Sequence, residues 1–371
     1  MTSARYETDY RQARRLLNSP RERLIFLALA VLLVAMPFVL PAYYVGEVTF
    51  IFIMCVASLG LMTLTGLTGQ VSLGQAAFVG IGAYIHTQLL TAGVPLPVSL
   101  LVTAACTALA GLLIAAACAA LAGVLVGVPA IRISGLHLAM VTLAFAIVTE
   151  HGLGRWKSLT GGHNGMAVPD PTLFGLSLGG PRAFYFLCLV VLLLVLLALL
   201  NLLRSSIGRA LIGVRDSEAA AHALGINVAR TKMLAFVLSA AVSGLAGALL
   251  AHQTQFITPE SFGLALSLQI VLMVFIGGMG SLRGAIFGAI LIGMLPAFIS
   301  SLKPMLPAQL ANQFGVDLFV YGAVLVGFVL LEPRGLNGRW IKLRDLLTTF
   351  PLVRRTAQRR GKAYMHSERY R

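Results

Sequence analysis

Long apolar stretches separated by short polar segments dominate the sequence. Each stretch is close to the roughly 20 residues that an α-helix needs to cross the hydrocarbon core of a bilayer. They cover residues 24–42, 47–66, 71–91, 97–128, 134–152, 183–203, 233–251, 263–281, 284–302 and 314–331. The pattern therefore predicts an all-α polytopic integral membrane protein with about ten transmembrane helices.

Three regions depart from a plain spanning helix. Residues 71–91 and 263–293 are rich in Gly, which would accommodate broken or re-entrant helices there. The block 97–128 is long for one crossing, so this helix would tilt or extend past the membrane.

Composition supports the membrane class. Of the 371 residues, 58% are hydrophobic and only 11% are charged, whereas a soluble domain carries roughly 25% charged residues. The cysteines all fall inside apolar stretches and are interpreted as small buried hydrophobic residues. The sequence contains no CxxC pair and no close group of His and Cys, so no metal site is predicted.

The basic residues indicate the orientation. With ten spans, 24 of the 28 Lys and Arg residues lie on one side of the membrane, which by the positive-inside rule is the cytoplasm. This predicts a multi-pass protein of a bacterial inner membrane with both termini cytoplasmic. The basic tails are residues 1–23 and 333–371, and the permease domain between them is 24–332. Anionic lipid headgroups account for the net charge of +15, so no nucleic-acid partner is expected.

The longest predicted cytoplasmic connection is residues 205–232. Asp216 or Ser217 can cap a helix, and Glu218 would then lie favourably in its first turn. Ala219 to Ala223 favour a helix, and Gly225 ends it. The result is a short helix with small side chains, which would dock into a groove of another protein or lie at the membrane interface.

Polar residues inside apolar spans mark candidates for the substrate pathway, because burying them in a membrane is costly. Gln70, Ser72 and Gln75 lie in a Gly-rich stretch where Gly66 and Gly69 leave room for a substrate. Hydrogen bonding between helices is the alternative role for such groups. Further polar candidates within the spans are His86, His137, Thr142, Thr149, Glu150 and Gln269.

Four stretches resemble the branched-chain amino acid permease family of ATP-binding-cassette (ABC) importers. TGLTGQVSLGQAAFVGIGAY at residues 65–84 resembles its N-terminal signature, and TGGHNGM at 160–166 resembles its external motif. GRALIGVRDSEAAAHALGIN resembles its coupling loop. GGMGSLRGAIFGA at 277–289 with EPRGL at 332–336 resembles its C-terminal end. The length of the chain, its TGG motif and its RDSEAAAHALGIN stretch resemble the LivM type of this family. The resemblance implies a fold near that of type II importers.

The resemblance assigns roles to two sets of residues. Coupling to an ATPase would involve Arg215, Asp216, Ser217, Glu218, Ala219, Ala220, Ala221 and Gly225. The external motif would comprise Thr160, Gly161, Gly162, Asn164 and Gly165. Two departures qualify these roles. Ala219 stands at the position of the Glu in the general ABC-permease pattern, and His163 stands where a small residue is expected.

The resemblance also implies the partners. The chain has no GxxxxGK[ST] phosphate-binding loop, so it is not expected to be an enzyme or to bind a cofactor, and ATP and Mg²⁺ would be bound by partner subunits. These are two cytoplasmic ATPases, alongside a second permease of the LivH type and an external substrate-binding protein. The external stretch 152–182 is the expected docking surface for the binding protein.

The predicted function is the permease subunit of an importer for branched-chain or other hydrophobic amino acids. A related importer for urea or small aromatic acids is the alternative cargo assignment. A secondary transporter without ATPases is the third alternative, but the spans hold almost none of the paired charges that ion coupling would use.

Overall fold

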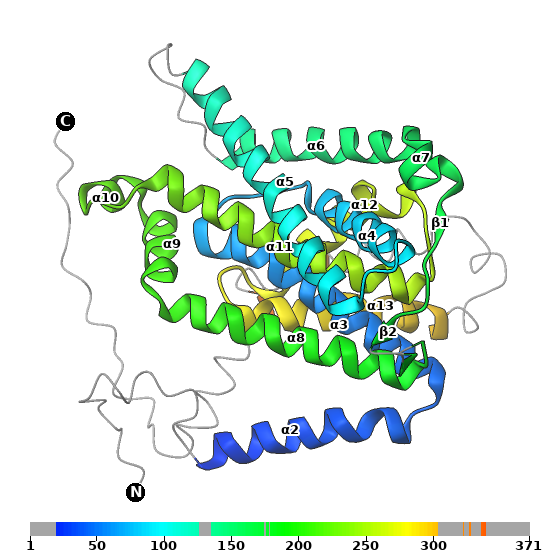
Figure 1. The fold of residues 1–371 in the computed structure, drawn as a ribbon. Helices are drawn as coiled ribbons and strands as arrows, with labels where there is room; N and C mark the ends of the chain where they lie inside the picture. Colours follow the sequence, from blue (N-terminus) through cyan, green and yellow to red (C-terminus); the bar gives the residue numbers. More distant parts are fainter. Residues whose placement is uncertain are drawn as a thin grey trace, which may run out of the picture.

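The computed structural model describes residues 20–125, 135–173, 176–177, 179–302, 322, 326–327 and 335–338. These residues form a bundle of helices with short antiparallel strand pairs (Figure 1). The predicted tails lie outside the described residues, apart from 20–23 and 335–338.

The first half of the chain is helical up to an irregular segment with short strands. Its elements are α2 (Pro20–Val39), α3 (Ala42–Leu61), the π-helical turn η1 (Met62–Gly66), α4 (Gln75–Thr91), α5 (Leu96–Leu125), α6 (Gly135–Arg155), α7 (Lys157–Thr160), η2 (Gly162–Asn164), β1 (Met166–Ala167), β2 (Thr172–Leu173) and β3 (Leu176–Ser177).

The second half begins with a long apolar helix. Its elements are α8 (Pro181–Arg204), α9 (Ser206–Asp216), α10 (Glu218–Ala223), α11 (Val228–Thr254), β4 (Phe256–Ile257), η3 (Pro259–Phe262), α12 (Leu264–Gly277) and α13 (Leu282–Leu302).

The helices coincide with the apolar stretches of the sequence. Within the described residues, each predicted stretch up to 284–302 contains a helix, whereas 314–331 is described only at 322 and 326–327. Four described segments are long and apolar enough to cross a bilayer: Ala42–Gly66, Pro181–Arg204, Val228–Thr254 and Pro259–Gly277. The helical, multi-pass class is confirmed, and the number of ten spans stays a prediction.

Two Gly-rich regions interrupt the helices. The chain leaves helical geometry after η1 and runs irregularly from Gly69 to Gly74, so α4 begins only at Gln75. Between α12 and α13 the chain turns through Gly278 and Gly280, whose φ angles are 109° and 87°. Because side chains with a Cβ rarely adopt such angles, glycine permits this turn.

Helix α3 is the centre of the bundle. In its membrane-length window 89% of the residues are buried, compared with 22% for α8, so α8 lies at the periphery. The rings of Phe52 in α3 and Tyr185 in α8 pack with centroids 5.1 Å apart. On another side, the Ser58 hydroxyl donates to the Ala285 carbonyl of α13 at 3.2 Å.

Helices α4 and α11 approach each other through glycine. A Cβ added at Gly82 would overlap the Gly244 carbonyl oxygen, and one added at Gly247 would overlap the carbonyl oxygen of Val79. Small residues at a helix interface allow backbones to come close, which is how helices associate strongly within a bilayer. The α4–α11 interface therefore depends on having glycine, which has no side chain, at positions 82 and 247.

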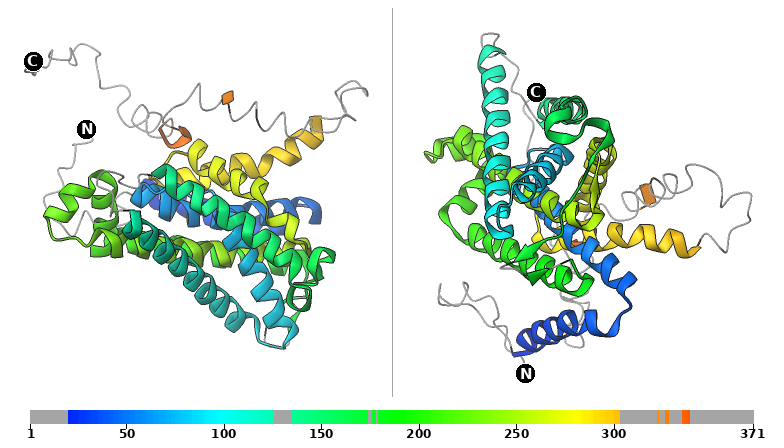
Figure 2. Two further views of the ribbon diagram at one scale, coloured as in Figure 1. Left: turned by 90° about the horizontal axis from the view of Figure 1, so that it is seen from above. Right: turned by 45° about the vertical axis from the view of Figure 1, so that its right-hand side comes forward.

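The connections collect at two opposite ends of the bundle (Figures 1 and 2). We call the end with α9 and α10 the α10 end, and the end with α7, β1 and β4 the β1 end. At the β1 end, Met166 pairs with Ile257 and Ala167 pairs with Phe256 in an antiparallel register. The strand pair thus joins two connections that are far apart in the sequence.

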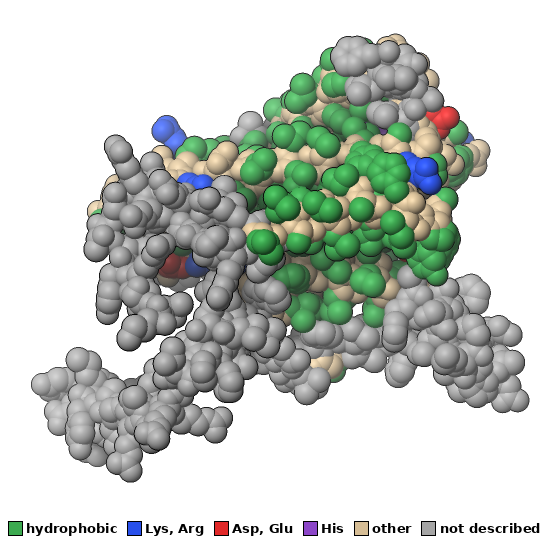
Figure 3. Space-filling view, turned by 90° about the horizontal axis from the view of Figure 1, so that it is seen from below, with side chains coloured by type: hydrophobic (Ala, Val, Ile, Leu, Met, Phe, Trp, Pro, Cys, Tyr) green, Lys and Arg blue, Asp and Glu red, His purple; other side chains and the backbone are tan. Residues whose placement is uncertain are grey.

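Apolar side chains cover much of the outer surface (Figure 3). Large exposed examples come from several helices and include Phe38, Leu101, Val148 and Leu194, which are 60–72% exposed. A contiguous exposed apolar surface indicates contact with lipid or with a partner subunit.

The α4–α11 contact gives the first prediction. Gly247→Ala should lower the free energy of unfolding by about 1–3 kcal/mol, because overpacking a tight interface forces backbone shifts. Gly152→Ala is the matched control, since a Cβ at Gly152 of α6 meets nothing within 4 Å. The melting temperature of each variant in detergent measures the effect. Equal melting temperatures for the two variants would contradict this account of the interface.

Candidate functional site

Helix α10 has defined caps at both ends. The Ser217 hydroxyl accepts from the backbone N–H of Ala220 at 3.2 Å, so Ser217 rather than Asp216 is the N-cap. At the other end, Gly225 has φ 81°, its N–H donates to His222 O, and the Ile226 N–H donates to Ala221 O, both at 3.0 Å. This pair of bonds is a Schellman motif, which satisfies the last carbonyls of the helix. The predicted short helix and its glycine stop are confirmed.

The surface of α10 is small and exposed. Ala221 packs inward, whereas Ala219 and Ala220 are exposed, and Leu224 directly after the helix is 81% exposed. Glu218 holds the helix against α11 through an ion pair of 2.7 Å with Lys232. A protruding leucine beside exposed alanines offers an apolar contact to a partner, with little side-chain entropy to lose.

The helix before α10 was not predicted from the sequence. In α9 the Ser205 hydroxyl accepts from the Gly208 N–H at 3.2 Å and caps the helix. Leu211 and Val214 are buried and lie three residues apart on one face. A serine followed by apolar residues at helical spacing is a helix-start signal, and it could have predicted α9 from the sequence.

Arg215, near the end of α9, connects the α10 end to the core of the bundle. Its Nη1 donates to the carbonyl of Gly66 at 2.9 Å, and Gly66 is the last residue of η1. Its Nε and Nη2 donate to Asp216 Oδ1 at 3.1 and 3.0 Å, which orients the guanidinium.

Three glycines surround the Arg215 side chain. A Cβ at Gly280 would lie 2.8 Å from Arg215 Nη1, and a Cβ at Gly69 would lie 3.4 Å from its Cγ. Gly66 itself lies against Gly280, because its Cβ would be 3.1 Å from the Gly280 nitrogen. We call Gly66, Gly69 and Gly280 the glycine notch. The notch joins the two helix breaks, and the guanidinium of Arg215 from α9 lies against it.

The predicted pathway residues do not form a single cluster. Gly66 and Gly69 belong to the glycine notch at the α10 end. Gln70 and Ser72 make local bonds: the Gln70 carbonyl accepts from the Thr65 hydroxyl at 3.0 Å, and the Ser72 hydroxyl accepts from the Gly74 N–H at 3.3 Å.

Gln75 lies deeper, at the first turn of α4. Its side chain is fully buried, and its Nε2 donates to the hydroxyls of Ser239, at 3.0 Å, and Ser243. Its Oε1 is buried and has no hydrogen-bond partner. Both serines lie near the middle of α11, so α4 begins about halfway through the bundle rather than at its end.

Side chains from two other helices satisfy the broken backbone beside Gln75. The Leu73 N–H donates to the Thr142 hydroxyl of α6, and the Ala76 N–H donates to the Ser267 hydroxyl of α12, both at 3.0 Å. The break thus places the positive end of the α4 dipole among buried hydroxyls and an amide oxygen. Half-helix N-termini of this kind attract anionic substrate groups in other membrane transporters.

The external motif builds a turn at the β1 end. The Thr160 hydroxyl donates to Leu153 O at 2.6 Å and accepts from the Gly162 N–H at 3.2 Å. Gly161 and Gly165 both have φ 71°. A Cβ at Gly165 would overlap the Ile257 carbonyl, so this glycine lets the turn pack on β4. Asn164 is exposed on the same turn.

Other polar candidates make contacts between helices. The Nε2 atoms of His86 in α4 and His252 in α11 lie 2.9 Å apart, and Ser99 Oγ lies 2.6 Å from His86 Nδ1. His252 was not singled out from the sequence, because nothing in the local pattern pairs it with His86. The side chain of His137 lies outside the described residues.

The comparisons with known proteins fit this architecture. The family model for the branched-chain amino acid transport system / permease component matches residues 43–329. The chain is 35% identical to the high-affinity branched-chain amino acid transport system permease protein LivM of Salmonella typhimurium LT2, over 86% of this chain and 76% of LivM. It is 28% identical to a probable LivH permease protein of Methanocaldococcus jannaschii, over 82% and 95% of the two chains. It is 30% identical to the autoinducer 2 import system permease protein LsrC of Enterobacter sp. 638, over 73% of each.

These matches identify the class. The protein is a membrane permease, and it belongs to the branched-chain amino acid transport system permease family. The resemblance to LivM predicted from the sequence motifs is confirmed. No solved structure matches the chain.

Proposed function

We propose that this chain is one of two permease subunits of an ATP-driven importer for branched-chain amino acids in a bacterial inner membrane. Two cytoplasmic ATPases would bind at the α10 end, and a binding protein would deliver the substrate at the β1 end. The observation that carries the proposal is the contact of Arg215, on the coupling segment, with the Gly66 carbonyl at a helix break.

Charge supports this orientation. The α10 end carries Arg204, Arg209, Arg215, Arg230 and Lys232. An excess of basic residues marks the cytoplasmic side of a membrane protein. With this end inside, both terminal tails are cytoplasmic if the chain makes ten crossings.

The chemistry of ATP hydrolysis belongs to the partners, because the chain has no phosphate-binding loop of the usual pattern. The exposed apolar surface of Ala219, Ala220 and Leu224 is the contact that an ATPase would bind. The caps of α10 define its ends, and its ion pair with Lys232 connects it to α11. A displacement of α10 by the ATPases would therefore also move α9 and Arg215.

Arg215 would transmit this force to the pathway. Its guanidinium sits in the glycine notch, which contains residues from both helix breaks. Withdrawing it would leave the Gly66 carbonyl without this donor and would free the two breaks to rearrange. Two discrete arrangements of a contact of this kind are what a transport cycle needs.

The substrate would bind at the first turn of α4. The partial positive charge of the helix N-terminus favours the carboxylate of an amino acid, and the unpartnered Gln75 Oε1 accepts from its ammonium group. Gln75 also holds α4 to α11 through Ser239 and Ser243, so it combines an interhelical bond with this role.

The similarity to LivM supports branched-chain amino acids as the cargo. The LivH relative supports a second permease subunit of that type as the partner in the membrane. The exposed apolar faces of α2, α5, α6 and α8 are the surfaces for this partner and for lipid. Urea, small aromatic acids and, by similarity to LsrC, autoinducer 2 are the alternative cargoes.

Uptake of labelled leucine tests the function directly. A strain in which this gene is deleted should lose high-affinity leucine uptake and regain it when the gene is restored. Labelled urea and benzoate are measured in parallel. Loss and rescue of urea or benzoate uptake alone would replace the amino acid with that cargo, and no change in any of the three would overturn the cargo assignment.

The docking surface predicts a loss of assembly. Leu224→Asp should reduce the amount of ATPase that co-purifies with the permease roughly tenfold, because it places a charge at an apolar contact. Leu159→Asp, on exposed α7 at the β1 end, is the control that should leave co-purification unchanged. If both variants retain the ATPases equally, α10 is not the docking surface.

The Arg215 contact predicts uncoupling. Arg215→Ala should retain the ATPases and their hydrolysis of ATP, whereas leucine uptake per ATP falls roughly tenfold or more, because a charge-assisted hydrogen bond is lost. Arg209→Ala is the control, since Arg209 is exposed on the same helix and its side chain donates to the nearby Arg204 carbonyl rather than to the glycine notch. Uptake and hydrolysis are measured together in proteoliposomes. An unchanged ratio in Arg215→Ala would refute this role of the glycine notch.

A further inference from the structure

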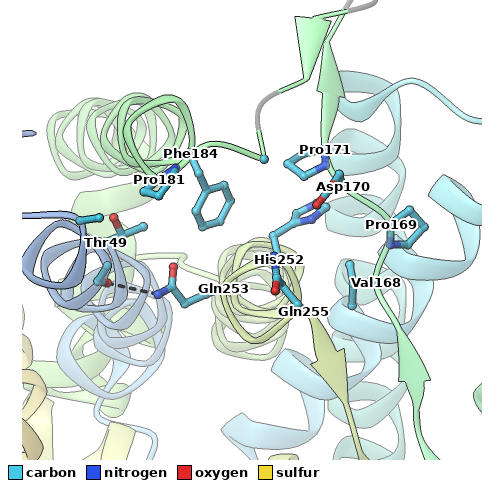
Figure 4. A pocket seen from close by; sticks show the side chains of 13 residues that line it. Thr49, Val168, Pro169, Asp170, Pro171, Pro181, Phe184, His252, Gln253 and Gln255 are labelled. Atoms are coloured by element: carbon cyan, nitrogen blue, oxygen red, sulfur yellow. Dashed lines mark hydrogen bonds between the residues drawn. The ribbon is translucent and has the colours of Figure 1, made fainter.

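A pocket of about 160 Å³ lies at the β1 end of the bundle, away from the helix break (Figure 4). It is formed by α3, α8, the end of α11 and the segment that follows β1. Its size is close to that of a cavity of roughly 150 Å³ that accommodates benzene, so its occupant is one small molecule. In the orientation proposed above, the pocket faces the side from which the substrate arrives.

The backbone around the pocket is fixed by specific bonds. Gln255 follows α11 with φ 57°, which is unusual for a residue other than glycine, and its carbonyl accepts from the Val168 N–H at 2.9 Å. Such conformations cluster at functional sites because the surrounding structure must hold them in place. The β1–β4 pair then holds residues 168–171 at the edge of the pocket.

Polar side chains from three segments line the pocket. Figure 4 shows the Asp170 carboxylate pointing toward the ring of His252. His252 is held by His86, and Gln253 is held by its bond to the Gly46 carbonyl at 3.2 Å. The Thr49 hydroxyl donates to Val45 O within α3 at 2.7 Å.

Apolar side chains lie between these polar groups, with Phe184 and Val168 each 8% exposed and prolines beside them. Among the residues that line the pocket, Asp170 is the acidic one, and there is no Lys or Arg. The Asp170 carboxylate, which faces His252, favours a cationic group, and the Phe184 ring favours an aliphatic side chain.

We propose that this pocket is an outer reception site for a small aliphatic amino acid, in which Asp170 binds the ammonium group and Phe184 packs against the side chain. The proposal rests on the proposed function and adds an outer site for its cargo, separate from the first turn of α4. An aromatic acid anion would be repelled by Asp170, and the neutral N–H groups of urea would donate weaker hydrogen bonds to it than an ammonium group does. The amino group is therefore the feature that the pocket selects.

The test uses the purified transporter, with its partner subunits but without the binding protein. Saturation-transfer NMR detects weak binding of three probes: leucine, isoamylamine, which lacks the carboxylate, and 4-methylpentanoate, which lacks the amine. Isoamylamine and leucine should give signals that depend on Asp170, whereas any 4-methylpentanoate signal, which would come from the first turn of α4, should not. Asp170→Asn should weaken the binding of isoamylamine roughly tenfold or more, and it should lower the leucine signal.

Glu260→Gln is the matched control, because Glu260 is an exposed acid in η3 at the same end and outside the pocket lining. Asp170→Glu should restore part of the binding. Equal isoamylamine signals from Asp170→Asn and the wild type, or a 4-methylpentanoate signal that Asp170→Asn reduces as much as that of isoamylamine, would overturn the proposal.

A second measurement separates this site from a docking surface for the binding protein. Uptake into proteoliposomes is titrated with leucine-loaded binding protein. Asp170→Asn should lower the maximal uptake and leave the half-saturating concentration of the binding protein unchanged. A changed half-saturating concentration with the same maximum would mean that Asp170 docks the binding protein. If the wild type itself takes up no leucine, the proposed function fails, whatever the outcome at Asp170.

Discussion

The constraint on which the structure depends is that backbone N–H and C=O groups inside a bilayer must find partners within the protein. At the helix breaks this constraint is met by side chains from distant segments. Thr142 and Ser267 accept from Leu73 and Ala76, and Arg215 donates to the carbonyl of Gly66. The break between η1 and α4 thus depends on partners that other helices supply.

This dependence links the α10 end to the middle of the bundle. The partner of Gly66 comes from α9, whereas the partners of Leu73 and Ala76 come from α6 and α12 at mid-depth. In the mechanism proposed above, a displacement of α9 would change the hydrogen bonding of the chain that leads to Gln75. The irregular segment 69–74 would be the connection between the two levels.

Some glycines of this protein allow close helix packing, and others allow an irregular backbone. Gly82 and Gly247 bring α4 and α11 into backbone contact, so this interface is sealed and rigid. Gly278 and Gly280 permit a turn that leaves room for a guanidinium. The α4–α11 interface is tightly packed, whereas the glycine notch is an irregular junction. In the proposed mechanism, a local change at the notch would therefore alter the break before α4 while the rest of the bundle keeps its packing.

The sequence by itself determined the membrane class, the positions of most helices, the family and the capped helix before Gly225. These features depend on apolar length, local capping and short motifs, all of which act between residues near one another in the chain. It could not show that Gln75 faces Ser239 and Ser243, that His86 meets His252, or that Arg215 enters a notch of glycines. Those pairings join residues 149 to 168 positions apart. Only the packing of α4 and α9 against α11 decides them, because helix periodicity fixes which face is apolar but not which partner it meets.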